Sequence, residues 1–136
     1  MSKFEKLLKL GMPVDRLRVG IYRRSEVSGF MPLSCEVLAE EKGGYIVCLE
    51  HNYIQNGDLM TDPRMDLSID PETKSVEPLN FEMNGMGIYQ EVYSEEGEIN
   101  TELFEQLNEF LDQWLDNCID QGHELKTKSE NQISDS

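Results

Sequence analysis

The stretch NTELFEQLNEFLDQWLDNCIDQG, residues 100–122, decides the fold class. Its apolar side chains recur at helical spacing and share one face, which predicts an amphipathic helix packed on a sheet. Asn100 is a suitable N-cap, and Gly122 suits the position that follows a last helical turn. We expect Phe110 and Trp114 to be buried against the sheet. The full apolar face comprises Leu103, Phe104, Leu107, Phe110, Leu111, Trp114, Leu115, Cys118 and Ile119.

Upstream of this helix, apolar runs alternate with turn signals, which predicts a meandering antiparallel β-sheet of about five strands. The polar stretch 56–63 is expected to be a loop, and residues 17–22 fit either a strand or the end of a helix. The fold class is therefore α+β, with the long C-terminal amphipathic helix on one face of the sheet. The expected strands are 33–40, 45–53, 65–69, 79–83 and 88–93.

The chain has 136 residues, which corresponds to one folded domain. Phe4, Leu7 and Leu8 predict a short N-terminal helix within a basic segment, residues 1–28. The α+β domain is expected to span residues 29–123, and the polar tail 124–136 is expected to be disordered. Lysines interrupt the first ten residues, so we expect no secretory signal, and no apolar run is long enough to cross a membrane. The three cysteines form no paired motif, which predicts reduced thiols and a cytoplasmic protein.

The charge is strongly negative and unevenly distributed. The formal net charge is −15, which argues against direct binding to nucleic-acid phosphates. Seven lysines and arginines lie within residues 1–24, whereas thirteen acidic residues and no base lie between Lys74 and Lys126. The simplest consequence is solubility, with the basic N-terminal segment folding back onto the acidic remainder.

Four stretches together resemble an uncharacterised bacterial domain family. They are GFMPL at 29–33, HNYIQNGDLMTDPRM at 51–65, GIYQEVY at 87–93 and NEFLDQWLDNCIDQGH at 108–123. The second stretch resembles the family's H-x-Y-x-Q-N-G-D-L-M-x-D-P-x-M signature, although Asn52 stands where an aromatic residue is expected. The resemblance implies a setting in plasmids, integrative elements or phages, sometimes beside anti-restriction domains. It implies no catalytic residue, because the family has no established activity.

An acidic strip on the C-terminal helix is the first candidate site. Its members recur at an average interval of 3.6 residues, the period of an α-helix. Like charges four residues apart destabilise a helix, so a strip without bases is unexpected on a surface that serves only solubility. We expect it to bind a basic protein surface, by imitation of nucleic-acid phosphates in one version, whereas the simpler alternative is a solvated acidic face. The acidic strip consists of Glu102, Glu105, Glu109, Asp112, Asp116 and Asp120.

A second candidate lies in the segment between His51 and Asp66. Imidazole and carboxylate groups at short spacing bind divalent metal ions, so this segment is an alternative site for a metal or another ligand. Its spacing matches no known metal motif, and the structural alternative is a turn at Asn56-Gly57 capped by aspartates, with His51 in the core. No other cofactor is indicated. The candidate residues are His51, Asn56, Asp58, Asp62 and Asp66.

A Cys35–His51 pair is the third candidate. A hairpin symmetric about Gly43 would place Cys35 opposite His51, and a thiolate beside an imidazole is the minimum for nucleophilic catalysis. A register change of one residue would move Cys35 to the other face of the sheet. No orienting carboxylate can be named. The sequence therefore favours a non-enzymatic interaction protein with no catalytic residue.

Overall fold

Three long strands form the centre of the sheet in the computed structural model, which describes residues 1–130: β2 (Leu33–Glu41), β3 (Gly44–Gln55) and β4 (Asp58–Asp70). Two-residue turns join them, and each turn has positive φ at both positions, at Lys42-Gly43 and at Asn56-Gly57. This backbone geometry suits the right-handed twist of the strands that it connects. The expected loop at 56–63 is therefore wrong, because β4 begins directly after the Asn56-Gly57 turn.

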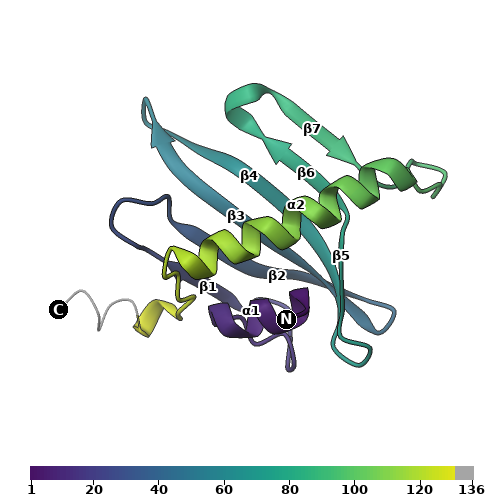
Figure 1. Ribbon diagram of the computed structural model, residues 1–136, viewed down its shortest axis with the longest axis horizontal. Coiled ribbons are helices and arrows are strands. Elements are labelled where there is room, and N and C mark those ends of the chain that lie inside the picture. Colours follow the sequence, from purple (N-terminus) through teal and green to yellow (C-terminus); the bar gives the residue numbers. More distant parts are fainter. Residues whose placement is uncertain (131–136) are drawn as a thin grey trace.

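Shorter strands complete a seven-stranded antiparallel sheet with the order β1-β2-β3-β4-β6-β7, to which β5 adds by pairing with β4 (Figure 1). The segment expected as one strand at 79–83 begins earlier and is divided at Leu79, whose backbone N–H donates to Asp66. The α+β class and the meander are confirmed, and the added strands raise the count above five. The short elements are β1 (Tyr22–Ser25), β5 (Ser75–Pro78), β6 (Asn80–Met83), β7 (Ile88–Glu91) and the 3-10 turn η1 (Asn84–Met86).

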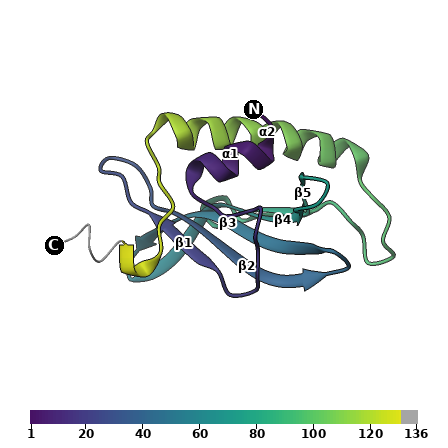
Figure 2. The ribbon, with the colours of Figure 1, turned by 90° about the horizontal axis from the view of Figure 1, so that it is seen from below.

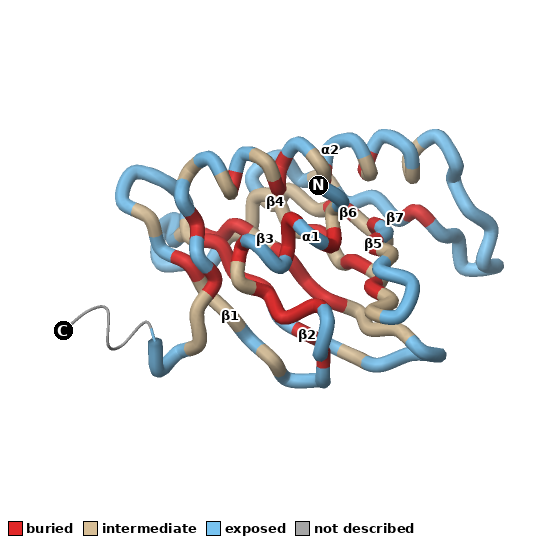
Figure 3. The backbone as a smooth tube through the Cα atoms, turned by 60° about the horizontal axis from the view of Figure 1, so that its bottom comes forward, coloured by how far each residue is buried: buried red, intermediate tan, exposed pale blue. Residues whose placement is uncertain are grey.

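Helices α1 (Lys3–Leu10) and α2 (Thr101–Asp120) lie on the same face of the sheet (Figure 2). The predicted cap of α2 is confirmed, since Asn100 Oδ1 accepts from the backbone N–H of Leu103 at 3.1 Å. Buried residues gather between the two layers (Figure 3). One core cluster joins residues of β2, β3 and β4 with residues of both helices. Within residues 1–130 no helix is long and apolar enough to span a membrane.

Trp114 is buried as expected, but Phe110 is not. Phe110 retains 38% of its exposure at the edge of the helix–sheet contact. Its ring still meets Phe81 edge to face, with the ring centroids 5.1 Å apart. Phe110 therefore contacts β6 without being buried.

The N-terminal segment belongs to the domain, and the expected boundary at residue 28 is wrong. Phe4, Leu7 and Leu10 of α1 are buried, and so are Met12 and Val14 in the segment that follows. These side chains join the single cluster that includes the inner face of the sheet. A helix of eight residues is not stable alone, so this docking holds it in place.

The tail is ordered at its start, which corrects the expectation that disorder begins at residue 124. Leu125 is buried, and its backbone N–H donates to Leu10 O at 2.6 Å. Lys126 exchanges two backbone hydrogen bonds with Arg24, at 2.9 and 3.0 Å, and so covers part of the β1 edge. Gly11 permits this close approach, because a Cβ at that position would collide with the carbonyl oxygen of Leu125. The rest of the expected tail, residues 131–136, lies outside the described residues.

The expected Cys35–His51 pair is also wrong. Cys35 lies opposite Leu49, and His51 lies opposite Leu33. The turn is not centred on Gly43, and a bulge between Val37 and Ala39 shifts the register further. The register therefore differs by two residues from the expected one. Both side chains stay on the inner face of the sheet, but Cys35 and His51 are not cross-strand partners.

Candidate functional site

The acidic strip is divided into a paired part and an unpaired part. Glu102, Glu105, Glu109 and Asp120 are exposed along the outer side of α2. Within residues 1–130 none of the four forms an ion pair. Asp112 and Asp116 are only partly exposed, because they lie on the flank of the helix that faces α1.

Lys6 of α1 neutralises this flank. Its ammonium group lies 2.7 Å from Asp112 Oδ1 and 2.8 Å from Asp116 Oδ1, and Lys6 is only 6% exposed. The hydrogen bond from Lys6 lowers the pKa of Asp112, and the bonds to the two carboxylates raise the pKa of Lys6. The prediction that the basic N-terminal segment folds back onto acidic residues is confirmed here. The acidic strip is therefore not one free surface of six carboxylates.

The unpaired acids continue beyond the N-terminus of α2. Glu95, Glu96 and Glu98 are exposed in the connection between β7 and α2. This connection is ordered by its own backbone, since Ser94 N–H donates to Glu98 O and Gly97 N–H donates to Ser94 O, each at 2.9 Å. We call the resulting surface the acidic end; it consists of Glu95, Glu96, Glu98, Glu102, Glu105 and Glu109. The long run without a basic residue indicates this surface in the sequence, but the predicted acidic strip includes only residues of the helix.

The segment between His51 and Asp66 does not converge on one point. Asn56 is in the tight turn and Asp58 is the first residue of β4, whereas Asp66 lies further along β4, where Asn80 Nδ2 donates to its Oδ2 at 2.9 Å. Asp62 Oδ1 is buried and lacks a hydrogen-bond partner among residues 1–130. No group of three or more His, Cys, Asp or Glu residues within that range could hold a metal ion.

His51 instead belongs to a buried cluster between β3 and the end of α2. Its Nδ1 contacts Pro32 O at 3.1 Å, and its Nε2 lies 3.8 Å from Cys118 Sγ. The imidazole also lies against Trp114 and His123, with ring centroids 5.5 and 5.7 Å away. His123 was missed from sequence, because a single polar residue after a helix carries no periodic signal.

The thiol of the buried cluster is a poor nucleophile. Burial raises the pKa of the Cys118 thiol to about 12, so the nucleophilic thiolate is scarce at neutral pH. Burial also lowers the pKa of His51 and of His123, which keeps both imidazoles neutral. His123 Nδ1 is 2.8 Å from Ser25 Oγ, and Ser25 Oγ accepts from the backbone N–H of Glu124. The cluster therefore fastens the segment after α2 to β1.

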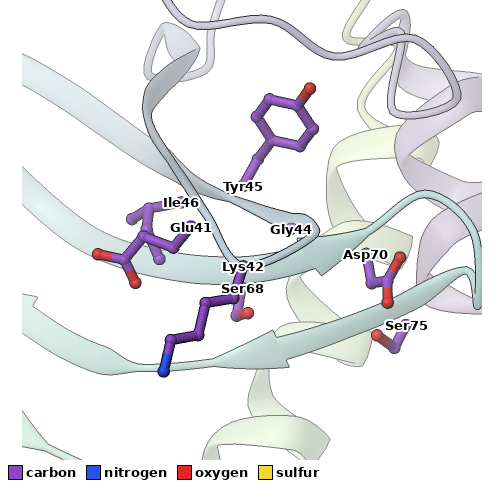
Figure 4. Close-up of a pocket in the computed structure, with 8 residues that line it drawn as sticks. All are labelled: Glu41, Lys42, Gly44, Tyr45, Ile46, Ser68, Asp70 and Ser75. Carbon is purple, nitrogen blue, oxygen red and sulfur yellow. The ribbon is translucent and has the colours of Figure 1, made fainter.

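A pocket of about 700 Å³ lies beside the β2–β3 turn. Figure 4 shows its labelled side chains pointing in different directions, with the Tyr45 ring directed away from Lys42 and Asp70. A ligand site normally combines an apolar lining with a few convergent polar groups. The polar groups that line this pocket do not converge, and none of the candidate site residues predicted from the sequence lines it.

Comparisons with known proteins identify the family. A family model described as "Domain of unknown function (DUF6908)" matches residues 2–124, and the chain belongs to this family. The matched range begins at the start of α1 and ends just after α2, in agreement with the inclusion of the N-terminal segment in the domain. No curated protein and no solved structure matches the chain.

Proposed function

We propose that this member of the DUF6908 family is a non-enzymatic interaction protein that binds a basic surface of another protein through the acidic end. One observation carries the proposal. The six carboxylates of the acidic end are exposed and form no ion pair within residues 1–130, whereas Lys6 neutralises Asp112 and Asp116 on the same helix. Acidic residues of α2 are thus paired where the helix contacts α1 and unpaired on the outer surface.

The energetic argument favours binding over solubility alone. Glu105 and Glu109 are one helical turn apart, and each such like-charge pair costs a few tenths of a kcal/mol that an interleaved lysine would remove. A concentrated field of one sign mainly accelerates association with an oppositely charged partner and selects against other partners. Solubility alone does not require the acidic residues to be gathered on one surface, because dispersed charges provide it as well.

The setting that we propose is the cytoplasm of a cell that carries a mobile genetic element. The four sequence stretches that resemble plasmid and phage domains support the element. The three cysteines are free and buried, as is common in reducing compartments. In that setting nucleic-acid-binding proteins are abundant basic partners, and the acidic end would then occupy their phosphate-binding surface.

Affinity capture from the native host tests the proposal. The bait proteins are the wild-type chain, a Glu102→Gln, Glu105→Gln, Glu109→Gln variant, and a matched control with Glu36→Gln, Glu72→Gln, Glu77→Gln. All six positions are exposed, so both variants change the net charge equally. We expect the first variant to lose the captured protein and the control to keep it. Equal capture by all three would contradict the proposal.

Competition with double-stranded DNA locates the bound surface on the partner. DNA that displaces the captured partner identifies its nucleic-acid site as the target, in support of phosphate imitation. A partner that stays bound at the same salt concentration is held through a different basic surface, and phosphate imitation is then excluded.

A further inference from the structure

Large apolar side chains are exposed on three loops of the sheet. Ile54 and Leu59, which flank the β3–β4 turn, are 69% and 61% exposed. Phe30 and Met31 are exposed in the β1–β2 connection, and Met86 is exposed in η1. Single exposed apolar residues are ordinary, but a concentration on adjoining loops is typical of an interaction site. We call these five residues the apolar edge.

Contacts between the loops place them at the same end of the sheet, away from the β2–β3 and β4–β5 turns (Figure 1). The backbone N–H of Asn52 donates to Pro32 O at 3.3 Å, which joins the β1–β2 connection to β3. On the other side of the hairpin, η1 approaches so closely that a Cβ on Gly85 would lie 3.1 Å from the Tyr53 hydroxyl. The β3–β4 hairpin therefore lies between the two other loops.

The tip of this hairpin is only two strands wide. β2 pairs with β3 as far as His51, and β6 pairs with β4 at Arg64, so the pairs from Asn52↔Thr61 to Gln55↔Asp58 extend beyond both neighbours. Ile54 and Leu59 are direct partners within this ribbon. A two-stranded ribbon is marginally stable in water, and an apolar surface placed against this pair would stabilise it.

Charge and side-chain type define what the edge would bind. Asp58 at the tip is exposed, and Glu50 and Glu82 are partly exposed beside the hairpin. Two arginines lie near its base, but Arg64 contacts Asp66, and Arg24, which donates to Asn52, contacts Glu26. The surroundings of the apolar edge are therefore acidic. Two of its five members are methionines, whose flexible side chains adapt to differently shaped apolar surfaces. A second copy of the chain is a poor occupant, because each copy carries a net charge of −15.

We propose that the apolar edge docks a basic amphipathic helix of the partner protein, with apolar side chains on one face and lysine or arginine on the other. The inference rests on the proposed function for the charge of the partner. The apolar edge lies at the opposite end of the molecule from the N-terminal half of α2 (Figure 1), so it adds a second contact, an apolar anchor that slows dissociation of a partner large enough to reach both.

Two synthetic peptides test the docking of such a segment on the full chain. One is an amphipathic Leu–Lys peptide of about 18 residues, long enough to form a helix on a protein surface, and the other replaces every Leu by Ser at the same charge. Fluorescence anisotropy measures both dissociation constants. We expect the wild-type chain to bind the Leu–Lys peptide about tenfold more tightly or better, which corresponds to burial of one large apolar side chain.

Variants assign this preference to the apolar edge. Ile54→Thr, Leu59→Thr should reduce the preference to about one, since threonine keeps the strand propensity and removes the apolar surface. Met86→Gln, in a different loop, should lower it as well. The matched control is Val19→Thr, Leu38→Thr, which changes two exposed apolar residues elsewhere and should leave the preference intact. Circular dichroism at the working temperature verifies that each variant is folded.

The outcomes separate this inference from the proposed function. Glu102→Gln, Glu105→Gln, Glu109→Gln should leave the ratio of the two dissociation constants unchanged, because the N-terminal half of α2 lies at the opposite end of the molecule from the β3–β4 turn (Figure 1). The acidic end is tested by affinity capture, in which equal capture by this variant and the wild type would contradict the proposed function and leave the docking inference standing. If the wild type shows no preference for the Leu–Lys peptide, or keeps it without Ile54 and Leu59, the docking inference is overturned.

Discussion

Two pairs of carboxylates on α2 have the same spacing but different surroundings, and their removal should have opposite effects on stability. Glu105 and Glu109 face solvent, whereas Asp112 and Asp116 accept hydrogen bonds from Lys6. The two changes to compare are Glu105→Gln, Glu109→Gln and Asp112→Asn, Asp116→Asn. Each removes two negative charges one helical turn apart, so the overall charge and the relief of like-charge repulsion within the pair are matched.

The expected magnitudes follow from exposure. The Asp112 and Asp116 side chains are 46% and 47% exposed, so solvent screens each contact with Lys6 to roughly 0.5–1 kcal/mol. The Lys6 side chain is only 8% exposed, so its ammonium group without a carboxylate adds a desolvation cost of about 1–2 kcal/mol. We expect the aspartate variant to lose about 2–4 kcal/mol of unfolding free energy, less a few tenths for the relieved like-charge repulsion. The glutamate variant should gain a few tenths of a kcal/mol.

Urea denaturation followed by Trp114 fluorescence measures both changes. The control is the same pair of variants in a Lys6→Met background, where the ammonium group is absent and methionine fills the space of the lysine stem. In that background the aspartate variant should behave like the glutamate variant. Equal stability of the two variants in the wild-type background would refute the structural role assigned to Lys6.

Three further predictions concern the core. Trp114→Ala should cost about 3–5 kcal/mol, and native Trp114 should emit as a buried indole; emission at the wavelength of free tryptophan would show that the packing is wrong. Because burial lowers the pKa of His51 and His123 below 6.5, stability should be complete above about pH 6.5 and fall as the pH decreases toward the folded-state pKa values. A urea midpoint that is equal at about pH 7.5 and about pH 5.5 would contradict this linkage. An aromatic disulfide reagent should label the thiols only after unfolding, because all three are buried, and rapid labelling of the native protein would exclude the burial of Cys35, Cys48 and Cys118.

Local signals predicted the elements of this fold well. The helical period and the cap at Asn100 predict α2, and the hairpin expected at Gly43 joins β2 to β3. The sequence predicts the Asn56-Gly57 turn too, but the polar residues after it give no strand signal. Those residues belong to a ribbon that projects beyond its neighbours, so its side chains need not be apolar to form a strand.

Features that depend on contacts between distant residues could not be predicted. The bulge near Val37 sets the register of β2 on β3, and no local sequence pattern predicts this bulge. Lys6 and Asp112 are 106 residues apart, so the division of the acidic strip follows from the docking of α1 on α2. The burial of Leu125 depends likewise on the turn at Gly11, which lies at the opposite end of the chain.

The association rate of the captured partner tests the central claim most directly. The rate should be measured for the wild type and for Glu102→Gln, Glu105→Gln, Glu109→Gln over a salt range of about 0.05–0.5 M, across which the screening length falls from about 14 to about 4 Å. We predict that the wild-type rate is fast and decreases steeply with salt. The variant should associate more slowly at low salt and depend weakly on it, with a smaller change in the dissociation rate. Identical rates with identical salt dependence would show that the acidic end is solvated surface and not the binding site.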